Sequence, residues 1–237
     1  MKRWVYAPSP LLTKSFREQL SSFPREPDMT VYGLRCAGML FLKIFLCSYF
    51  RLRMTGRENI PPKGPFVLVA NHSSHLDAVA LSMALRPRQW YHAYAAAAQD
   101  YFFRSFLRAI AAIAFTNAIP FDRKEDPQKS LELCADLLQV SREAILMFPE
   151  GTRSPNGQIQ QFRLGVGKLV AGTDVPVIPA YIDGAYRAWP KGYFVPKPRR
   201  VTVRIGSPRT YAHLAAVQQS FISIANDLQQ AVLQLKE

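Results

Sequence analysis

Residues 66–81, with the sequence FVLVANHSSHLDAVAL, form the stretch that decides the fold. The first five residues are apolar and predict a strand, and residues 78–81 predict the start of a helix. The polar break between them carries an imidazole at His72 and a carboxylate at Asp77. Five residues within one helix advance by about 140°, so these two side chains would not face each other there. A strand–turn–helix unit, in contrast, lets the chain fold back and bring them together.

The pair formed by His72 and Asp77 predicts acid–base chemistry. A carboxylate that holds one imidazole nitrogen leaves the other nitrogen free to act as a general base. Taken alone, the pair has a simpler interpretation, in which Asp77 caps the helix and His72 is an ordinary turn residue. His75 is a second imidazole, and its two-residue separation from Asp77 predicts that these two side chains point apart. Ser73 and Ser74 lack a glycine-flanked nucleophile elbow, so we interpret them as turn or capping residues.

Residues 144–154, AILMFPEGTRS, form a second apolar run that ends in a polar loop. Gly151 permits a positive φ or the close approach of a ligand to the backbone. Thr152 supplies a hydroxyl, and the planar guanidinium of Arg153 is suited to binding phosphate. Glu150 can orient that guanidinium or accept a hydrogen bond from a substrate hydroxyl. The alternative is a surface loop whose local Glu–Arg pair contributes little to stability.

These two stretches together resemble the glycerolipid acyltransferase family, whose members acylate glycerol phosphate and lysophosphatidate. The family's first motif, Asn-His-x4-Asp, matches Asn71, His72 and Asp77. Its third motif, Phe-Pro-Glu-Gly-Thr-Arg-Ser, matches residues 148–154, and its fourth, Val-Pro-x-Ile-Pro, matches residues 175–179. The resemblance covers most of the chain, and three motifs in the family's order are a much stronger signal than any one of them.

The family's second motif, Gly-x-x-Phe-Ile-x-Arg, is matched less closely by residues 117–123, NAIPFDR. Asn117 stands in place of the glycine and Pro120 in place of the first aromatic residue, whereas Arg123 matches the arginine. In the family this arginine binds the phosphate of the acyl acceptor, so the resemblance assigns that role to Arg123. The alternative is a solvated run of mixed charge over residues 122–126.

The resemblance implies an O-acyltransferase that moves a fatty acyl group from acyl-CoA or acyl carrier protein to a lysophospholipid hydroxyl. The expected reaction converts lysophosphatidate to phosphatidate by direct transfer, with glycerol 3-phosphate or another lysophospholipid as the alternative acceptor. The expected catalytic residues are His72 and Asp77. The residues expected to bind substrate are Asn71, Arg123, Glu150, Gly151, Thr152 and Arg153. The acyl donor is a substrate, so no cofactor is expected, and the histidines and cysteines form no predicted metal site.

The chain of 237 residues has a formal net charge of +13, from 30 basic and 17 acidic residues. A charge of this sign favours anionic partners, which include membranes, phosphorylated substrates and nucleic acid. The sequence contains no helix-turn-helix, RNP or zinc pattern, so a nucleic-acid partner is not expected. Two further classes stay open: a hydrolase that uses the same His–Asp pair on water, and a catalytically inactive, membrane-bound relative.

An apolar segment near the N-terminus predicts contact with a membrane. Residues 36–50 are almost wholly apolar, and the charge of Lys43 within them would be costly at the centre of a spanning helix. Arg35, Lys43 and Arg51 stay on one broad side of a helix. This pattern favours an amphipathic helix in the membrane interface, and the alternative is a helix hairpin packed on the protein's own core. The side chains predicted to face lipid are Phe41, Leu42, Phe45, Leu46 and Phe50.

The turn-rich residues 61–65, PPKGP, separate this element from the rest of the chain. We therefore predict an N-terminal tail and interfacial helical element at residues 1–62, and an α/β acyltransferase domain at residues 63–237. The basic residues Arg51, Arg53 and Arg57 flank the apolar segment. The chain is therefore expected to be membrane-associated, monotopic or peripheral, at an anionic surface on the cytoplasmic face.

Predicted strands and helices alternate along the rest of the chain. This alternation favours an α/β fold with a mainly parallel sheet flanked by helices. Strands are predicted at residues 66–70, 89–95, 117–121, 144–148, 177–181 and 201–205. Helices are predicted at residues 78–85, 100–114, 127–141, 165–172 and 211–235.

A basic stretch near the C-terminus contains Lys197, Arg199, Arg200, Arg204 and Arg209. Such a stretch could bind the phosphates of coenzyme A, an acidic carrier protein or lipid headgroups. The simpler interpretation is a solvated loop.

Overall fold

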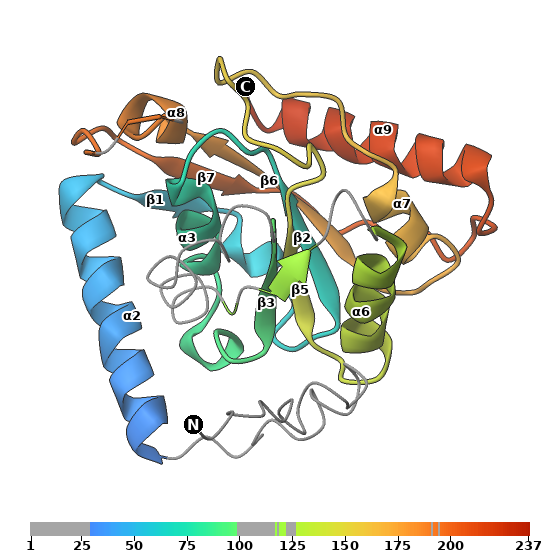
Figure 1. Ribbon diagram of the computed structural model, residues 1–237, viewed down its shortest axis with the longest axis horizontal. Helices are drawn as coiled ribbons and strands as arrows, with labels where there is room; N and C mark the ends of the chain where they lie inside the picture. The colour runs from blue at the N-terminus through green and yellow to red at the C-terminus, as the bar shows by residue number, and fades with distance from the viewer. Residues whose placement is uncertain (1–28, 99–116, 118, 122–126, 191, 194) are drawn as a thin grey trace, which may run out of the picture. The chain divides into compact units, whose positions relative to one another are not determined.

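The computed structural model describes residues 29–98, 117, 119–121, 127–190, 192–193 and 195–237 (Figure 1). The chain divides into two compact units, residues 1–38 and residues 39–237. The larger unit holds all the described strands and both stretches of the predicted site.

A sheet of seven described strands forms the centre of the larger unit (Figure 1). The strands are β1 (Arg53–Thr55), β2 (Phe66–Ala70), β3 (Ala93–Ala98), β4 (Ile119–Phe121), β5 (Ala144–Met147), β6 (Val177–Asp183) and β7 (Thr202–Ile205). Their order across the sheet is β1-β7-β6-β2-β5-β3-β4. β6 and β7 pair antiparallel, and the other neighbouring strands pair parallel. The predicted α/β fold with a mainly parallel sheet is therefore confirmed.

Six helices are described, together with two short 3-10 turns at Arg57–Asn59 and Pro87–Gln89. The helices are α2 (Met29–Tyr49), α3 (Leu76–Ser82), α6 (Pro127–Gln139), α7 (Gly165–Val170), α8 (Ala185–Ala188) and α9 (Gln218–Gln234). Helix α9 begins later than the predicted residue 211, because Val217 at its N-cap is extended, with φ −121° and ψ 160°. The helix predicted at residues 100–114 lies outside the described residues.

Helices cover both faces of the sheet, and alternate residues of β2 show which helices lie on each face. Phe66, Leu68 and Ala70 belong to one buried apolar cluster, together with residues of α2, α3 and α8. Val67 and Val69 point the opposite way, into a second cluster with residues of α6, α7 and α9. All five residues are fully buried. β2 is thus a central strand, and the turn that follows it begins from a rigid position.

The inner side of α2 packs on this core, which corrects part of the lipid-facing prediction. Leu46 lies in the same cluster as β2, and Phe50 just after the helix is also buried there. The prediction that Leu46 and Phe50 face lipid is therefore wrong, because both side chains pack into the buried cluster that contains β2. Phe41 and Phe45 are exposed, and Leu42 is partly buried. Within the described residues, no helix has both the length and the apolar character needed to cross a membrane.

The sheet begins on the N-terminal side of the boundary predicted at residue 62. Strand β1 pairs with β7, with Met54 opposite Val203, and the Arg53 N–H donates to the Val201 carbonyl at 3.0 Å. The compact unit starts at residue 39, because the last turns of α2 and the strand β1 add to the same core and sheet.

Candidate active site

The two predicted stretches follow neighbouring strands and end at the same edge of the sheet. β2 and β5 pair in parallel with Val69 opposite Met147, and continuing this register places His72 opposite Glu150. In open α/β sheets, ligands bind outside the carboxyl ends of the parallel strands. The order of the strands therefore brings these residues together, although 78 positions separate them in the sequence.

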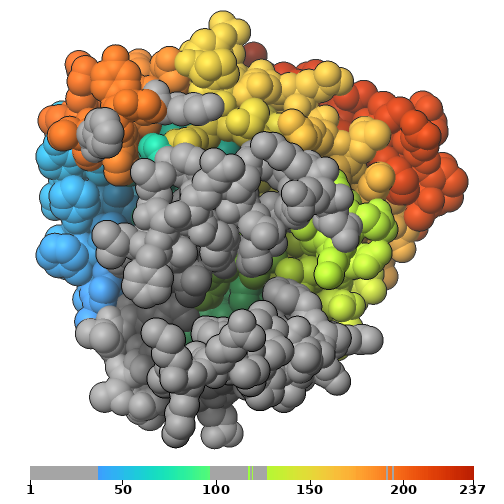
Figure 2. All heavy atoms as spheres, viewed as in Figure 1, coloured from blue at the N-terminus to red at the C-terminus, as the bar shows by residue number. Residues whose placement is uncertain are grey.

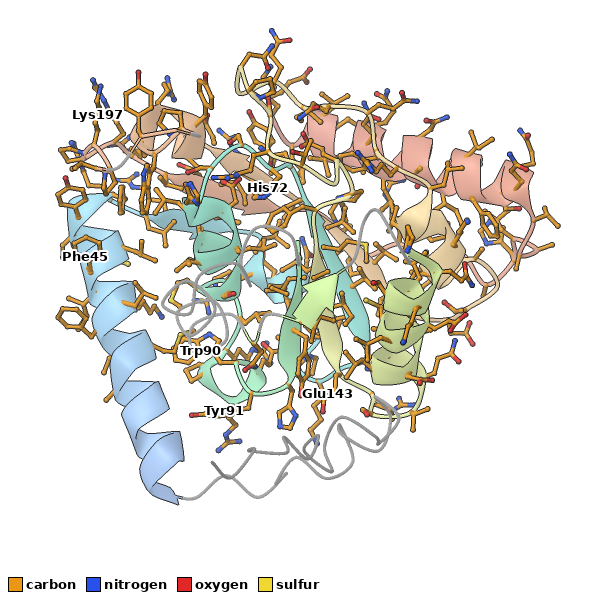
Figure 3. The ribbon with its side chains drawn as sticks, in the orientation of Figure 1. Phe45, His72, Trp90, Tyr91, Glu143 and Lys197 are labelled. Atoms are coloured by element: carbon orange, nitrogen blue, oxygen red, sulfur yellow. The ribbon has the colours of Figure 1, made fainter. Side chains whose placement is uncertain are left out.

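The structure brings His72 and Asp77 into hydrogen-bond contact. His72 lies beyond the carboxyl end of β2 (Figure 3), and its Nδ1 atom is 2.9 Å from Oδ2 of Asp77. The Asp77 side chain is fully buried, and that of His72 is 21% exposed. A carboxylate can only accept, so Nδ1 is the donor of this contact, and a neutral ring then has the lone pair of Nε2 available as a base. The ring of Phe148 stacks on the imidazole at 4.3 Å between centroids, which fixes the plane of the ring.

Asp77 also holds the turn between β2 and α3. Its Oδ2 atom accepts hydrogen bonds from the N–H groups of Ser73 at 2.5 Å and Ser74 at 2.7 Å. Asp77 is not the cap of α3, because its bonds go to N–H groups before the helix and His75 is the N-cap residue. One buried oxygen of Asp77 instead serves the backbone of the turn and the imidazole at once. The carboxylate cannot rotate without losing contacts with the turn, so the position of the imidazole is coupled to the backbone.

Glu150 joins the two stretches to each other. Its Oε1 atom accepts the N–H of His72 at 2.8 Å, and its Oε2 atom accepts the N–H of Gln160 at 3.1 Å. In return, the Ser154 N–H donates to the carbonyl of His72 at 2.8 Å. Burial raises the pKa of Glu150 to about 7, and the two N–H donors act in the opposite direction. These contacts favour a positioning role, whereas the predicted contact of Glu150 with substrate stays a prediction.

Asn71 ties the same turn to the strand on the other side of β2. Its Nδ2 atom donates to the Ile182 carbonyl at 3.0 Å, and its Oδ1 atom accepts the Ile182 N–H at 2.7 Å. The side chain is buried, and it continues the pairing of β2 with β6 beyond the end of the strand. Asn71 therefore positions the turn, and its predicted contact with substrate stays a prediction.

The loop after β5 contains groups that suit an anion. Gly151 has a φ of 72°, in the left-handed region that favours glycine. Thr152 and Arg153 are half-buried. Nη1 of Arg153 donates to Nε2 of His75, so the second imidazole lies against the guanidinium rather than competing for Asp77. A guanidinium has five N–H donors in a planar fork, a geometry that suits an anion.

Comparison with known proteins identifies the family of this chain. Residues 51–183, more than half of the chain, match the family described as Acyltransferase. The chain belongs to this acyltransferase family. A 1-acyl-sn-glycerol-3-phosphate acyltransferase from Chlamydomonas reinhardtii is 31% identical over 149 residues, 61% of this chain and 42% of that protein. The alpha form from Homo sapiens is 25% identical over 181 residues, 74% of this chain and 61% of that protein.

This chain spans about half the length of the curated acyltransferases that it matches. Its fold is similar to the crystal structure of the 1-acyl-sn-glycerophosphate acyltransferase from Thermotoga maritima, with a TM-score of 0.65. The alignment covers 95% of this chain and 85% of that chain, at 23% sequence identity. At that identity the likeness concerns the fold alone.

The other two motifs of the acyltransferase family have different places in the chain. Residues 175–179, the fourth motif, lie at the start of β6, where Val177 pairs with Val67 and is fully buried. This motif therefore builds the sheet. Arg123 of the second motif, which the sequence predicts to bind the acceptor phosphate, lies outside the described residues.

Trp189 belongs to none of the sequence motifs, yet it lies beside them in the structure. The centroid of its ring lies 5.2 Å from the centroid of the His75 ring. Its carbonyl accepts a hydrogen bond from Ser74 Oγ at 2.7 Å. Trp189 follows the carboxyl end of β6. An aromatic residue in a loop at that edge of the sheet is the signal that could have pointed to it.

The basic stretch predicted near the C-terminus separates into two groups. Arg209 pairs with Asp227 of α9 at 2.6 Å, and Arg204 donates to the Leu235 carbonyl at 3.3 Å. The remaining three basic residues of the stretch, together with Arg187 of α8, line a pocket of about 490 Å³ beside that helix. The residues that line this pocket are Arg187, Lys197, Arg199 and Arg200.

Proposed function

We propose that this chain transfers a fatty acyl group from an acyl thioester to the free hydroxyl of lysophosphatidate, forming phosphatidate. The observation that carries the proposal is the 2.9 Å contact between His72 Nδ1 and Asp77 Oδ2, beside a loop suited to phosphate. Lysophosphatidate is 1-acyl-sn-glycerol-3-phosphate, the compound that appears in the names of the relatives, which supports this choice of acceptor.

The proposed transfer is direct. Nε2 of His72 takes the proton of the acceptor hydroxyl while the hydroxyl oxygen attacks the carbonyl carbon of the thioester. The new C–O bond forms, the C–S bond breaks, and the leaving thiolate receives the proton from His72. Asp77 holds the Nδ1–H and stabilises the imidazolium between these steps. The donor, acyl-CoA or acyl carrier protein, is a substrate, and the proposed steps include no acyl-enzyme, cofactor or metal.

The phosphate of the acceptor is proposed to bind at the loop after β5. Arg153 and the Thr152 N–H supply the donors, and Gly151, whose own N–H donates to the Phe148 carbonyl at 3.0 Å, lets the backbone approach the ligand closely. Arg123 is the second arginine that the resemblance assigns to this phosphate. His72 and Arg153 follow neighbouring strands, and Glu150 holds the two turns together. The general base and the anion-binding groups thus approach one substrate from two sides.

We place the reaction at an anionic membrane, on its cytoplasmic face, with α2 in the interface. The outer side of α2 supports this location, because large apolar side chains are exposed along it. These side chains are Leu40, Phe41, Ile44 and Phe45. The net charge of +13 adds attraction to anionic lipid.

A lipid-product screen with the purified full chain tests the proposed function. Acyl-CoA and acyl carrier protein are each offered with lysophosphatidate, glycerol 3-phosphate or lysophosphatidylethanolamine, and monoacylglycerol serves as the matched acceptor without phosphate. We expect phosphatidate from lysophosphatidate as the fastest product, and little product from monoacylglycerol. Free fatty acid as the main product with lysophosphatidate present would indicate a hydrolase. Absence of product with every pair would indicate an inactive relative.

A further inference from the structure

The basic pocket beside α8 has no part in the proposed chemistry. Four cations line it, and the guanidinium of Arg187 forms an exposed pair with Asp183 at 3.6 Å. Among the described residues, no ion pair involves Lys197, Arg199 or Arg200. The pocket therefore carries an excess of positive charge, and its ligand is expected to be anionic.

Exposed apolar side chains lie in the loop that leads into this pocket. Tyr193 is 58% exposed and Val195 is 73% exposed. The ammonium group of Lys197 lies 5.7 Å from the centroid of the Tyr193 ring. A soluble phosphorylated metabolite would bind the cations, but an exposed valine beside them would add nothing to its affinity. Apolar and aromatic side chains mixed with cations are the composition that suits the headgroup region of a bilayer.

The outer side of α2 adjoins this loop. The Tyr49 hydroxyl donates to the carbonyl of Pro196 at 3.0 Å, and the ring of Phe45 stacks on that of Tyr49 at 5.3 Å. Figure 2 shows the exposed turns of α2 directly beside α8 and the loop after it. In Figure 3, Phe45 projects from α2 away from the sheet and Lys197 projects beyond α8. The exposed apolar and basic side chains thus form one continuous surface.

The same loop is connected to the turn that carries His72. The Trp189 indole N–H donates to the carbonyl of Tyr193 at 2.7 Å. The Trp189 carbonyl accepts from Ser74, and its ring packs against His75. Two hydrogen bonds and a ring contact therefore join the loop to the candidate active site.

We propose that this surface docks the chain on an anionic phospholipid bilayer, with the loop after α8 as a second contact beside α2. The docking residues are Arg187 of α8 and, in the loop after it, Tyr193, Val195, Lys197, Arg199 and Arg200. The cations bind lipid phosphates, and Tyr193 and Val195 insert among the headgroups. The benefit of docking rests on the proposed function, since it would bring the His72 turn to the bilayer that holds a lysolipid acceptor. The binding itself is independent of that function.

Vesicle co-sedimentation of the full chain tests the proposal without any measurement of activity. The probes are phosphatidylcholine vesicles with and without phosphatidylglycerol, at low and high salt. The variant reverses three loop charges, Lys197→Glu, Arg199→Glu and Arg200→Glu. Its matched control reverses three exposed charges elsewhere, Lys63→Glu, Arg88→Glu and Lys236→Glu, and so has the same net charge.

We expect the loop variant to bind anionic vesicles at least about tenfold more weakly than the control variant at low salt. The difference should shrink at high salt, because screening removes the contribution of the charges. A second variant, Tyr193→Ser with Val195→Ser, should weaken binding at both salt concentrations. Equal binding by the loop and control variants would overturn the proposal.

Turnover of short-chain, monomeric substrates in solution separates this proposal from the function. If both proposals hold, the loop variant keeps the wild-type KM for the donor and loses rate only with vesicle-borne acceptor. A raised donor KM in solution would overturn docking, because it would assign the pocket to the phosphates of the donor. If the wild type shows no turnover with any substrate but still binds anionic vesicles more tightly than the loop variant does, the proposed function is contradicted and the docking surface is supported.

Discussion

The turns after β2 and β5 and the basic pocket beside α8 lie at the same edge of the sheet, but their polar groups are held differently. In the turns, Asp77, Glu150 and Asn71 are buried and bond to backbone groups of other segments. In the pocket, Lys197 and Arg199 are exposed to solvent.

This difference indicates that the turns and the pocket have different roles. Buried side chains with several backbone partners hold one geometry, which proton transfer and anion binding need. Exposed cations are screened by water and salt, so they suit long-range attraction to a charged surface rather than precise placement of a substrate. Changes in the turns should therefore alter catalysis and folding, whereas changes in the pocket should alter where the protein binds.

The replacement Asp77→Asn should have the largest effect among changes that keep the size of the side chain. An amide offers an oxygen to the turn, but it carries no charge to stabilise the imidazolium of His72. We expect kcat to fall by about 10²–10⁴ with a largely folded protein. Steady-state kinetics and a thermal unfolding curve on the same sample measure this. A folded variant with nearly wild-type kcat would show that the charge of Asp77 does not contribute to catalysis.

Two glycine replacements compare a closely packed position and an unpacked position in the segment around the pocket. Gly184 and Gly192 both have a positive φ, of 79° and 93°. A Cβ at Gly184 would lie 2.0 Å from the carbonyl oxygen of Arg200, whereas a Cβ at Gly192 meets no described atom within 4 Å. Gly184→Ala should cost roughly 3 kcal/mol or more, and Gly192→Ala about 1 kcal/mol. Urea unfolding measures both, and equal losses would show that Arg200 is not held against the end of β6.

The titration of Glu150 should appear in the pH dependence of stability. Burial raises the pKa of this carboxyl from its usual 4.5 to about 7, so the folded chain binds the proton more tightly than the unfolded chain. Its contribution to stability is present below about pH 4.5 and is lost as the pH rises to about 7, by at most about 3 kcal/mol. Glu150→Gln removes this titration. Urea unfolding of both proteins across this range should give diverging curves, and parallel curves would contradict the assignment.

A smaller effect is expected at His75, which contacts Arg153 rather than the reacting atoms. His75→Leu should raise KM for lysophosphatidate by about five- to tenfold, since one hydrogen bond to the guanidinium is worth about 1 kcal/mol. kcat should change less. His75→Gln, which restores an acceptor, should recover most of the affinity. The opposite kinetic pattern, a large fall in kcat at constant KM, would indicate that His75 is the general base.

The sequence predicted the strands and turns of the candidate site because their signals are local. An apolar run followed by polar residues marks each turn, and parallel pairing brings the ends of β2 and β5 to one edge. The two hydrogen bonds between Asn71 and Ile182 could not be predicted, because they join residues 111 positions apart.

The same limit explains the error on α2. A regularly apolar helix does not reveal which side faces the core, and Leu46 turned out to be buried while Phe45 is exposed. The contact between Arg153 and His75 also depends on the order of the strands rather than on local sequence. The role predicted for Arg123 stays a prediction, since this residue lies outside the part of the chain that the structure describes.

The proposed transfer depends most on the imidazole at position 72. The rate of phosphatidate formation by His72→Ala, measured beside wild type on samples with matching thermal midpoints, examines it directly. Removal of a general base predicts a loss of about 10² or more in rate with lysophosphatidate and either thioester. A folded His72→Ala protein that forms phosphatidate at most of the wild-type rate would contradict it.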